Sequence, residues 1–271
     1  MVQYIVTTVK SKPHLNGKAR EIAASLNCLF AERGEHTLEF FKDEFASAIL
    51  IIVGDTRIVA RVGNSELFFH PSMSLLRLMN HAKGQVDRMA EAMALKPGMH
   101  VLDCTLGFAS DALVASYLTG PTGSVTGVEA SPLAALLVRM GVNEYTVRVH
   151  DGLERHKAQV LAALPGAMQR IKVINMHHLD FLLAAKSKSF DIVYFDPMFR
   201  KPRTESASMA PLRGLALPDP ISVSSVQAAM RVARRRVVLK EGRFSTEFAR
   251  LGFSLIPGGK YSEVAYGIIE V

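Results

Sequence analysis

The residues with the clearest chemical potential are Asp196-Pro197-Met198-Phe199, which follow the apolar run 191–195. An exocyclic amine on an aromatic ring is a poor nucleophile because its lone pair is delocalised into the ring. The Asp196 carboxylate and the Pro197 carbonyl can accept hydrogen bonds from both amine hydrogens while Phe199 stacks on the ring. We therefore predict catalytic roles for Asp196, Pro197 and Phe199 in methyl transfer to a flat amine. The alternative is that Asp-Pro only begins a turn after a strand.

A second set of small and polar residues lies where an earlier strand is predicted to end, in Val101-Leu-Asp-Cys-Thr-Leu-Gly-Phe-Ala-Ser-Asp111. Small residues let a ligand approach the backbone, and the amino terminus of the following helix can receive polar or anionic groups. Glu129 ends the next strand about 22 residues beyond Gly107, a spacing typical of an acid that binds ribose hydroxyls. The candidate cofactor-binding residues are Asp103, Gly107, Ser110, Asp111 and Glu129. The alternative is that the aspartates cap the helix and Glu129 is a solvated strand end.

The third strand of this series is predicted to end at Asn175, and His177 and His178 follow it. Nucleoside-binding folds of this type place an acid or an amide near the adenine ring at this point, and Asp180 comes slightly later. Two adjacent histidines are more often hydrogen-bonded loop residues than ligands. With no third His or Cys in register, we expect no metal site.

The formal charge of +7 and the isoelectric point near 9.5 favour a polyanionic partner such as RNA. Two clusters concentrate the charge, and we take five of their members as candidate RNA-binding residues: Arg200, Lys201, Arg203, Arg213 and Lys240. The first four directly follow the Asp196–Phe199 segment, whereas Lys240 belongs to a cluster that begins at Arg231. The alternative is that these side chains solvate helix faces and cap helix ends.

The order of apolar segments and of the turn-forming residues between them predicts two α/β units. Residues 1–84 read as a small unit with a β-hairpin at Gly63-Asn64. Residues 85–271 alternate strand and helix, which predicts a mainly parallel sheet covered on both faces. The segment Pro257-Gly258-Gly259 is too short for a crossover helix, so the last two strands are expected to pair antiparallel.

Composition excludes several classes of protein. Two cysteines without CxxC or Cys/His spacing argue against a disulfide framework and a zinc site, and they favour a reducing, cytoplasmic compartment. We see no signal-peptide pattern at the amino terminus and no apolar run of about 18 residues, so no membrane contact is expected. One glycine where a dinucleotide fingerprint has three makes an NAD-linked dehydrogenase improbable.

These motifs resemble those of class I S-adenosylmethionine methyltransferases, and among them a distant branch of the bacterial 16S ribosomal RNA guanine-N2 methyltransferase J family. The resemblance covers about two thirds of the chain. It runs through Phe69-His-Pro-Ser-Met73, Val101–Asp111, Glu129–Leu137, Asp196–Phe199 and Arg236-Val-Val-Leu-Lys240.

The resemblance implies a Rossmann-like, seven-stranded sheet with its last strand antiparallel, and S-adenosylmethionine as the cofactor. It implies that the cofactor pocket is lined by Ser110, Asp111, Glu129, Ala130, the His177-His178 region and Asp196. It also implies small-subunit ribosomal RNA as the partner and guanine N2 as the methylated atom.

Our leading hypothesis is methyl transfer from S-adenosylmethionine to an exocyclic amine of a base in RNA. One alternative is a methyltransferase of the same fold that acts on a small molecule or a protein. Another is a non-catalytic RNA-binding protein that keeps the fold as a scaffold. The residues themselves do not separate guanine from adenine or cytosine amines.

Overall fold

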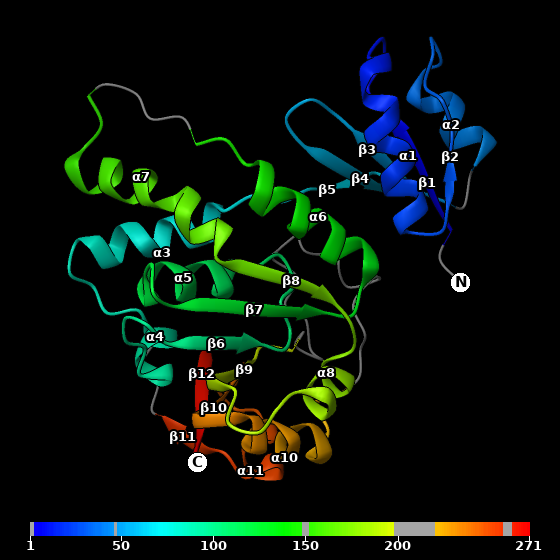
Figure 1. Cartoon of the computed structure of the whole chain (residues 1–271). Helices are drawn as coiled ribbons and strands as arrows, with labels where there is room; N and C mark the ends of the chain where they lie inside the picture. The colour runs from blue at the N-terminus through cyan, green and yellow to red at the C-terminus, as the bar shows by residue number, and fades with distance from the viewer. Residues whose placement is uncertain (1–2, 46–47, 148–151, 198–219, 257–261) are drawn as a thin grey trace.

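The computed structural model describes residues 3–45, 48–147, 152–197, 220–256 and 262–271 (Figure 1). The first part of the chain forms a five-stranded sheet in the order β2-β1-β3-β4-β5, in which β1, β2 and β3 are parallel and β3, β4 and β5 are antiparallel neighbours. Its elements are β1 (Tyr4–Thr8), the 3-10 helix Pro13–Leu15, α1 (Asn16–Ser25), β2 (Leu29–Phe30), α2 (Leu38–Glu44), β3 (Ile49–Val53), β4 (Ile58–Val62) and β5 (Ser65–Leu67). The predicted hairpin is β4–β5, and Gly63 between them has a positive φ of 59° that its turn requires.

The second part forms a seven-stranded sheet in the order β11-β12-β10-β9-β6-β7-β8. Its strands are β6 (His100–Asp103), β7 (Ser124–Glu129), β8 (Ile171–Asn175), β9 (Phe190–Phe195), β10 (Ala233–Gly242), β11 (Ser254–Ile256) and β12 (Val264–Glu270). Strands β6 to β10 are parallel, and β12 lies antiparallel between β10 and β11. The Rossmann-like sheet with an antiparallel last strand is therefore confirmed.

Helices cover both faces of the large sheet, as its apolar central strands require. They are α3 (Ser72–Ala82), α4 (Arg88–Met93), α5 (Ser110–Thr119), α6 (Pro132–Glu144), α7 (Arg155–Gln169), α8 (His178–Ala184), α10 (Val223–Val232) and α11 (Glu247–Leu251). One core holds side chains of α3, α4, α5 and α7, and the other holds side chains of α8, α10 and α11. Val193 and Phe195 of β9 are fully buried in the second core, and Tyr194 is buried in the first.

Helix α6 lies between the two sheets (Figure 1). Leu133, Leu136, Leu137 and Met140 recur at helical spacing and pack with the core of the small sheet. Other residues of the same helix pack on the large sheet, so one helix is shared by both cores.

The packing places α3 with the large sheet. Leu78 of α3 and Phe69 before it share a core with α4 and α5, although a division at residue 84 assigns both to the small unit. We therefore propose that the boundary lies before Phe69. Gly141 of α6 makes this packing possible, because a Cβ there would lie 2.2 Å from Cγ of Phe69.

Strand β2 and helix α7 are not evident from the apolar pattern of the sequence. Strand β2 has only two residues, and α7 contains Pro165, which lowers helix propensity. Burial of Val160, Leu161 and Leu164 against the sheet helices stabilises α7 despite the proline.

Candidate active site

The site lies at the carboxyl ends of the central parallel strands β6, β9 and β10. Asp103 is the last residue of β6, and Asp196 directly follows β9. Phe195 pairs with Leu239, so the next residues along the two strands, Asp196 and Lys240, lie beside one another. The β9–β10 register thus places a carboxylate next to an ammonium group.

A chain of alternating charges runs from α4 to the catalytic candidate Asp196. Arg77 of α3 donates to Asp87, the N-cap of α4, from Nε at 2.8 Å and from Nη2 at 2.9 Å. Arg77 also donates to Oδ1 of Asp111 on α5. Lys240 Nζ then bridges Oδ2 of Asp111 at 3.0 Å and Oδ2 of Asp196 at 2.6 Å.

Asp111 lies at the centre of this chain, and both of its carboxylate oxygens accept hydrogen bonds from protein groups. Its Oδ2 also accepts a hydrogen bond of 2.7 Å from the Tyr194 hydroxyl. Burial disfavours its charge, but the Lys240 ammonium and the Arg77 guanidinium outweigh burial and hold the pKa of Asp111 below its ordinary value. Asp111 was predicted to line the cofactor pocket. Its contacts also allow a structural role, in which its carboxylate holds Arg77, Lys240 and Tyr194 in place.

The carboxyl groups of Asp196 and Asp103 are held differently. Burial raises the pKa of Asp196 to about 7 in spite of Lys240, and the nearby Asp111 contributes to the rise. Burial also raises the pKa of Asp103, whose residue is 2% exposed, to about 8. Burial therefore favours the protonated form of both carboxyl groups, and at Asp196 the Lys240 ammonium opposes this effect.

Thr105 joins the two motifs. Its backbone N–H donates to Oδ1 of Asp103 at 3.0 Å, and its hydroxyl accepts a 2.6 Å hydrogen bond from the backbone N–H of Asp196. Sequence reasoning missed Thr105, Arg77 and Tyr194. Thr105 lies within the first motif, but its contact depends on β6 and β9 being neighbours in the sheet.

Glu129 lies at the end of β7 with its carboxylate turned toward the loop after β6. Its Oε2 accepts from the backbone N–H of Gly107 at 2.9 Å, and its Oε1 accepts from that of Ser131 at 2.8 Å. Burial raises its pKa. Gly107 has a φ of +51°, which glycine adopts without strain.

The amino terminus of α5 adjoins this loop. Its N-cap, Ala109, is left-handed with a φ of 59° and has no side-chain hydrogen bond to the helix. The backbone oxygen of Ser110 accepts a 3.0 Å hydrogen bond from the Ser74 hydroxyl of α3. The first turn of α5 thus has no capping side chain, and its N–H groups can serve a ligand.

Asn175 and the two histidines lie at the end of β8. The Asn175 amide donates to the backbone oxygens of Glu129 at 2.8 Å and Ala130 at 3.2 Å. Nδ1 of His177 accepts from Leu179 and caps α8. His178 Nε2 lies 3.1 Å from Ser225 Oγ, its ring packs edge-on against Phe195, and burial lowers its pKa to about 4.

Lys240 occupies a different place from the one that its grouping with the RNA-binding residues predicts. Its side chain is only 20% exposed, and its ammonium contacts two carboxylates. Because Lys240 is committed to the interior, we assign it to the site and not to a phosphate-binding surface.

The other members of the Arg231 cluster also have protein partners. Arg231 donates to the backbone oxygens of Leu182 and Ala185, and Arg236 pairs with Glu270. Arg231 precedes β10 and Arg236 lies in its first half, at the opposite end of the strand from Lys240, whereas Arg243 directly follows β10.

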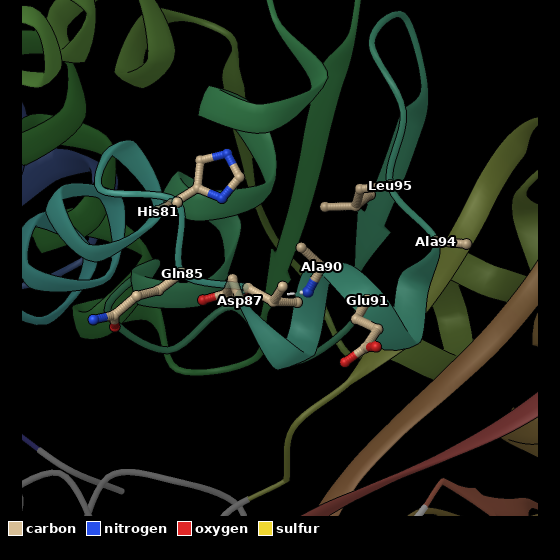
Figure 2. A pocket seen from close by; sticks show the side chains of 9 residues that line it. His81, Gln85, Asp87, Ala90, Glu91, Ala94 and Leu95 are labelled. Atoms are coloured by element: carbon tan, nitrogen blue, oxygen red, sulfur yellow. Dashed lines mark hydrogen bonds between the residues drawn. The ribbon is translucent and has the colours of Figure 1, made fainter.

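Pro197 is the last described residue before a gap. Phe199, Arg200, Lys201, Arg203 and Arg213 lie outside the described residues, so their predicted roles stay predictions. A hollow of about 380 Å³ lies elsewhere, between the end of α3 and α4 (Figure 2). It is lined by Asp87, whose Oδ1 accepts from the Ala90 N–H at 3.1 Å, and by residues that precede β6.

None of the helices in the described segments combines the length and apolarity needed to cross a bilayer. Within the same segments, His, Cys, Asp and Glu do not gather in threes that could hold a metal ion.

Comparison with known proteins decides the family. A family model described as "Putative SAM-dependent methyltransferase" matches residues 68–251. The chain belongs to this family of S-adenosylmethionine-dependent methyltransferases. The topology of the large sheet is that of the class I enzymes, and S-adenosylmethionine is the cofactor that family and fold imply.

Several relatives match along much of this methyltransferase. "Uncharacterized protein YpiP" of Bacillus subtilis is 33% identical over 268 residues, 98% of each chain. Ribosomal RNA small subunit methyltransferase J of Pseudoalteromonas atlantica is 27% identical over 258 residues, 89% of this chain and 88% of its own. The protein of that name from Pseudomonas aeruginosa (strain LESB58) is 32% identical over 180 residues, 64% of this chain and 62% of its own.

Among solved structures, a SAM-dependent methyltransferase from Aquifex aeolicus aligns with a TM-score of 0.43 at 15% identity, over 74% of this chain and 99% of its own. TrmN from Thermus thermophilus aligns with a TM-score of 0.44 at 14% identity, over 99% of this chain and 72% of its own.

The groups around the β6 and β7 ends fit S-adenosylmethionine in this methyltransferase. The cofactor has two ribose hydroxyls, an amino-acid carboxylate and an amine. Glu129 supplies acceptor oxygens of the kind that ribose hydroxyls need, and the uncapped amino terminus of α5 supplies N–H donors for a carboxylate. Space for a backbone approach comes from Gly107, where even a Cβ would lie 3.9 Å from the backbone oxygen of Thr105.

Proposed function

We propose that this methyltransferase acts on an exocyclic amine of a nucleobase in RNA, and that the amine is guanine N2 of small-subunit ribosomal RNA. The observation that carries the proposal is the placement of Asp196 and Pro197 at the end of β9, beside Lys240 and next to the candidate cofactor residues. The relatives named ribosomal RNA small subunit methyltransferase J support RNA as the substrate. The net charge of +7 supports it independently.

The proposed cofactor residues surround the loop after β6. Glu129 binds the ribose hydroxyls in place of one or both of its present N–H donors, Gly107 and Ser131. Ser110 presents the first backbone groups of α5, and Ala130 and His177 lie toward the base. Asp103 and Asp111 order the loop and the helix from the interior.

Bound S-adenosylmethionine supplies a methyl group on a positively charged sulfur. When bound, the cofactor would supply the carbon for the new bond to the substrate nitrogen, and its sulfur would keep the electron pair of the broken carbon–sulfur bond. Asp196 and the Pro197 carbonyl accept hydrogen bonds from the amine and direct its lone pair toward the methyl carbon. The nitrogen then gives up one proton, which Asp196 can take and pass to water because burial raises its pKa to about 7.

Substitution of Asp196 and of Glu129 tests the proposal. The substrates are naked 16S ribosomal RNA and 30S subunits from cells that lack the gene, with labelled S-adenosylmethionine and mass spectrometry to identify the modified base. Asp196→Ala is expected to lower methyl transfer by about 10²–10³-fold, because an acceptor that aligns the amine is lost. Binding of S-adenosylhomocysteine, measured by calorimetry, is expected to fall much less than methyl transfer, although Asp196 is also one of the predicted pocket-lining residues.

Glu129→Ala is the matched control for the other half of the site. It is expected to weaken S-adenosylhomocysteine binding by about 10–100-fold, since hydrogen bonds to a charged group contribute about 1.5–3 kcal/mol. If folded wild-type protein binds the cofactor product and methylates neither RNA substrate, a protein or small-molecule substrate replaces RNA. If it binds RNA but not the cofactor product, the non-catalytic reading replaces both.

A further inference from the structure

Two carboxylates of the candidate site share one ammonium group. Asp111 and Asp196 both approach a single cation, Lys240 Nζ, at 3.0 and 2.6 Å. Two carboxylates in a mostly buried site repel each other, and each disfavours ionisation of its neighbour. A cation between them is what allows both to be charged at once.

Lys240 is itself fixed in place. Its strand position sets it beside Asp196, and Asp111 holds its ammonium from the opposite side. Asp111 is anchored by Tyr194 at 2.7 Å and by Arg77, which Asp87 holds through two hydrogen bonds. The three inner members, Arg77, Asp111 and Lys240, therefore each have a charged partner on either side, and the chain ends at Asp196, which the proposed function assigns to the substrate amine.

We propose that Lys240 is the positioning residue of the reaction: its ammonium fixes one oxygen of the Asp196 carboxylate and compensates its charge, so that the other oxygen receives the substrate amine. The proposal rests on the function proposed above, since it concerns the same carboxylate. Lys240 does not touch the substrate in this scheme. It acts through Asp196, which without a cation would lose both its orientation and much of its negative charge.

The groups that face Asp196 come from several elements and determine the sign of each substitution. Lys240 favours the charged carboxylate, whereas Asp111 disfavours it. Among the described residues, Asp103 at the end of β6, Tyr194 of β9 and Tyr266 of β12 also interact electrostatically with Asp196. Since Lys240 and Asp111 act in opposite directions, substituting them should move the titration of Asp196 in opposite directions.

The test uses Lys240→Met, Lys240→Arg and Asp111→Asn in the full chain with S-adenosylhomocysteine bound. The titration of Asp196 is followed by carboxyl ¹³C NMR, with Asp196→Asn used to assign its signal. The pH dependence of kcat/KM is measured on 30S subunits from cells that lack the gene. The first measurement needs no methyl transfer, so it remains informative if the substrate is different.

Lys240→Met is expected to raise the midpoint of Asp196 by about one pH unit or more and to move the acid limb of kcat/KM by the same amount. One unit corresponds to about tenfold less activity on the acid side of the profile, with recovery toward high pH. Lys240→Arg keeps the charge and should stay near the wild-type midpoint. Asp111→Asn should lower the midpoint, and it carries the test if Lys240→Met does not fold.

An Asp196 midpoint that is the same in wild type, Lys240→Met and Asp111→Asn would overturn the proposal, even if those variants are less stable. A shifted midpoint in a protein that methylates no RNA would overturn the proposed substrate and leave the positioning role intact. If the protein methylates RNA but the Asp196 midpoint is the same in all variants, the proposed substrate stands and the positioning role of Lys240 is wrong.

Discussion

At the scale of single residues, the candidate site consists of side chains that meet at the carboxyl ends of parallel strands. Asp103, Asp196 and Glu129 come together at one edge of the sheet because they end parallel strands. Their partners were not predictable, since Arg77 and Lys240 lie 34 and 129 residues from Asp111 in sequence. The sequence of one segment predicts where its strand ends. It does not predict an ion pair between two distant segments, because that pair depends on how the segments pack.

Asp103 gives a prediction about stability and pH. Its carboxyl is protonated in the folded protein up to about pH 8, but it ionises near its ordinary pKa of 3.8 when unfolded. The folded state therefore binds more protons between about pH 4 and 8, and stability falls as pH rises through that window. Asp103→Asn removes this penalty and keeps an acceptor for the Thr105 N–H.

The difference in free energy of unfolding between Asp103→Asn and wild type is expected to increase by on the order of 1–2 kcal/mol in favour of the variant when the pH is raised from 6 to 8. Urea unfolding of the cofactor-free protein at several pH values measures the difference. Asp43→Asn on the exposed side of α2 serves as the control. A difference between Asp103→Asn and wild type that is independent of pH would show that the Asp103 carboxyl is already ionised in the fold.

At the scale of elements, apolar periodicity and turn residues predicted most helices and strands, but not all of them. The hairpin at Gly63 and the antiparallel end of the large sheet followed from local turn residues and loop length. Helix α7 did not, because Pro165 masks a helix that tertiary packing stabilises. The paired histidines after β8 show the same limit, since His178 contacts Ser225 of α10, 47 residues away.

Helix α6 gives a prediction at this scale. Gly141→Ala puts a methyl group where the Phe69 side chain lies, at 2.2–2.4 Å from three of its atoms. We expect a loss of about 1–3 kcal/mol from overpacking, which outweighs the better helix propensity of alanine.

Gly17→Ala is the matched control, because Gly17 also lies in a helix but nothing approaches its Cβ position within 4 Å. It should be neutral or more stable by up to about 1 kcal/mol. Denaturant unfolding of both variants makes the comparison. Equal stabilities for the two would mean that Phe69 moves aside without cost.

At the scale of the whole molecule, α6 joins two sheets that the sequence presents as separate units. The predicted division at residue 84 separates α3 from α4, whereas one core contains side chains of both helices. Domain boundaries depend on which apolar faces meet, and a linear pattern does not contain this information. The shared helix also means that neither core is complete alone.

Deletion of residues 1–67 tests this dependence. It leaves Leu133, Leu136, Leu137 and Met140 of α6 without the small sheet, so the truncated chain should bind a hydrophobic dye and unfold at lower temperature than the full chain. Leu136→Gln with Met140→Gln in the truncated chain should reduce dye binding. A truncated chain that unfolds at the wild-type temperature without binding dye would show that the two cores are independent.

The chain of charges from Asp87 to Asp196 also constrains how such proteins can change over evolution. Arg77 balances two carboxylates on neighbouring helices, so its replacement by a neutral residue leaves buried negative charge without compensation. Natural variants that lack Arg77 should therefore also have lost Asp87 or Asp111. Sequence change on α3 and α4 would in this way be tied, residue by residue, to the charge balance of the candidate active site.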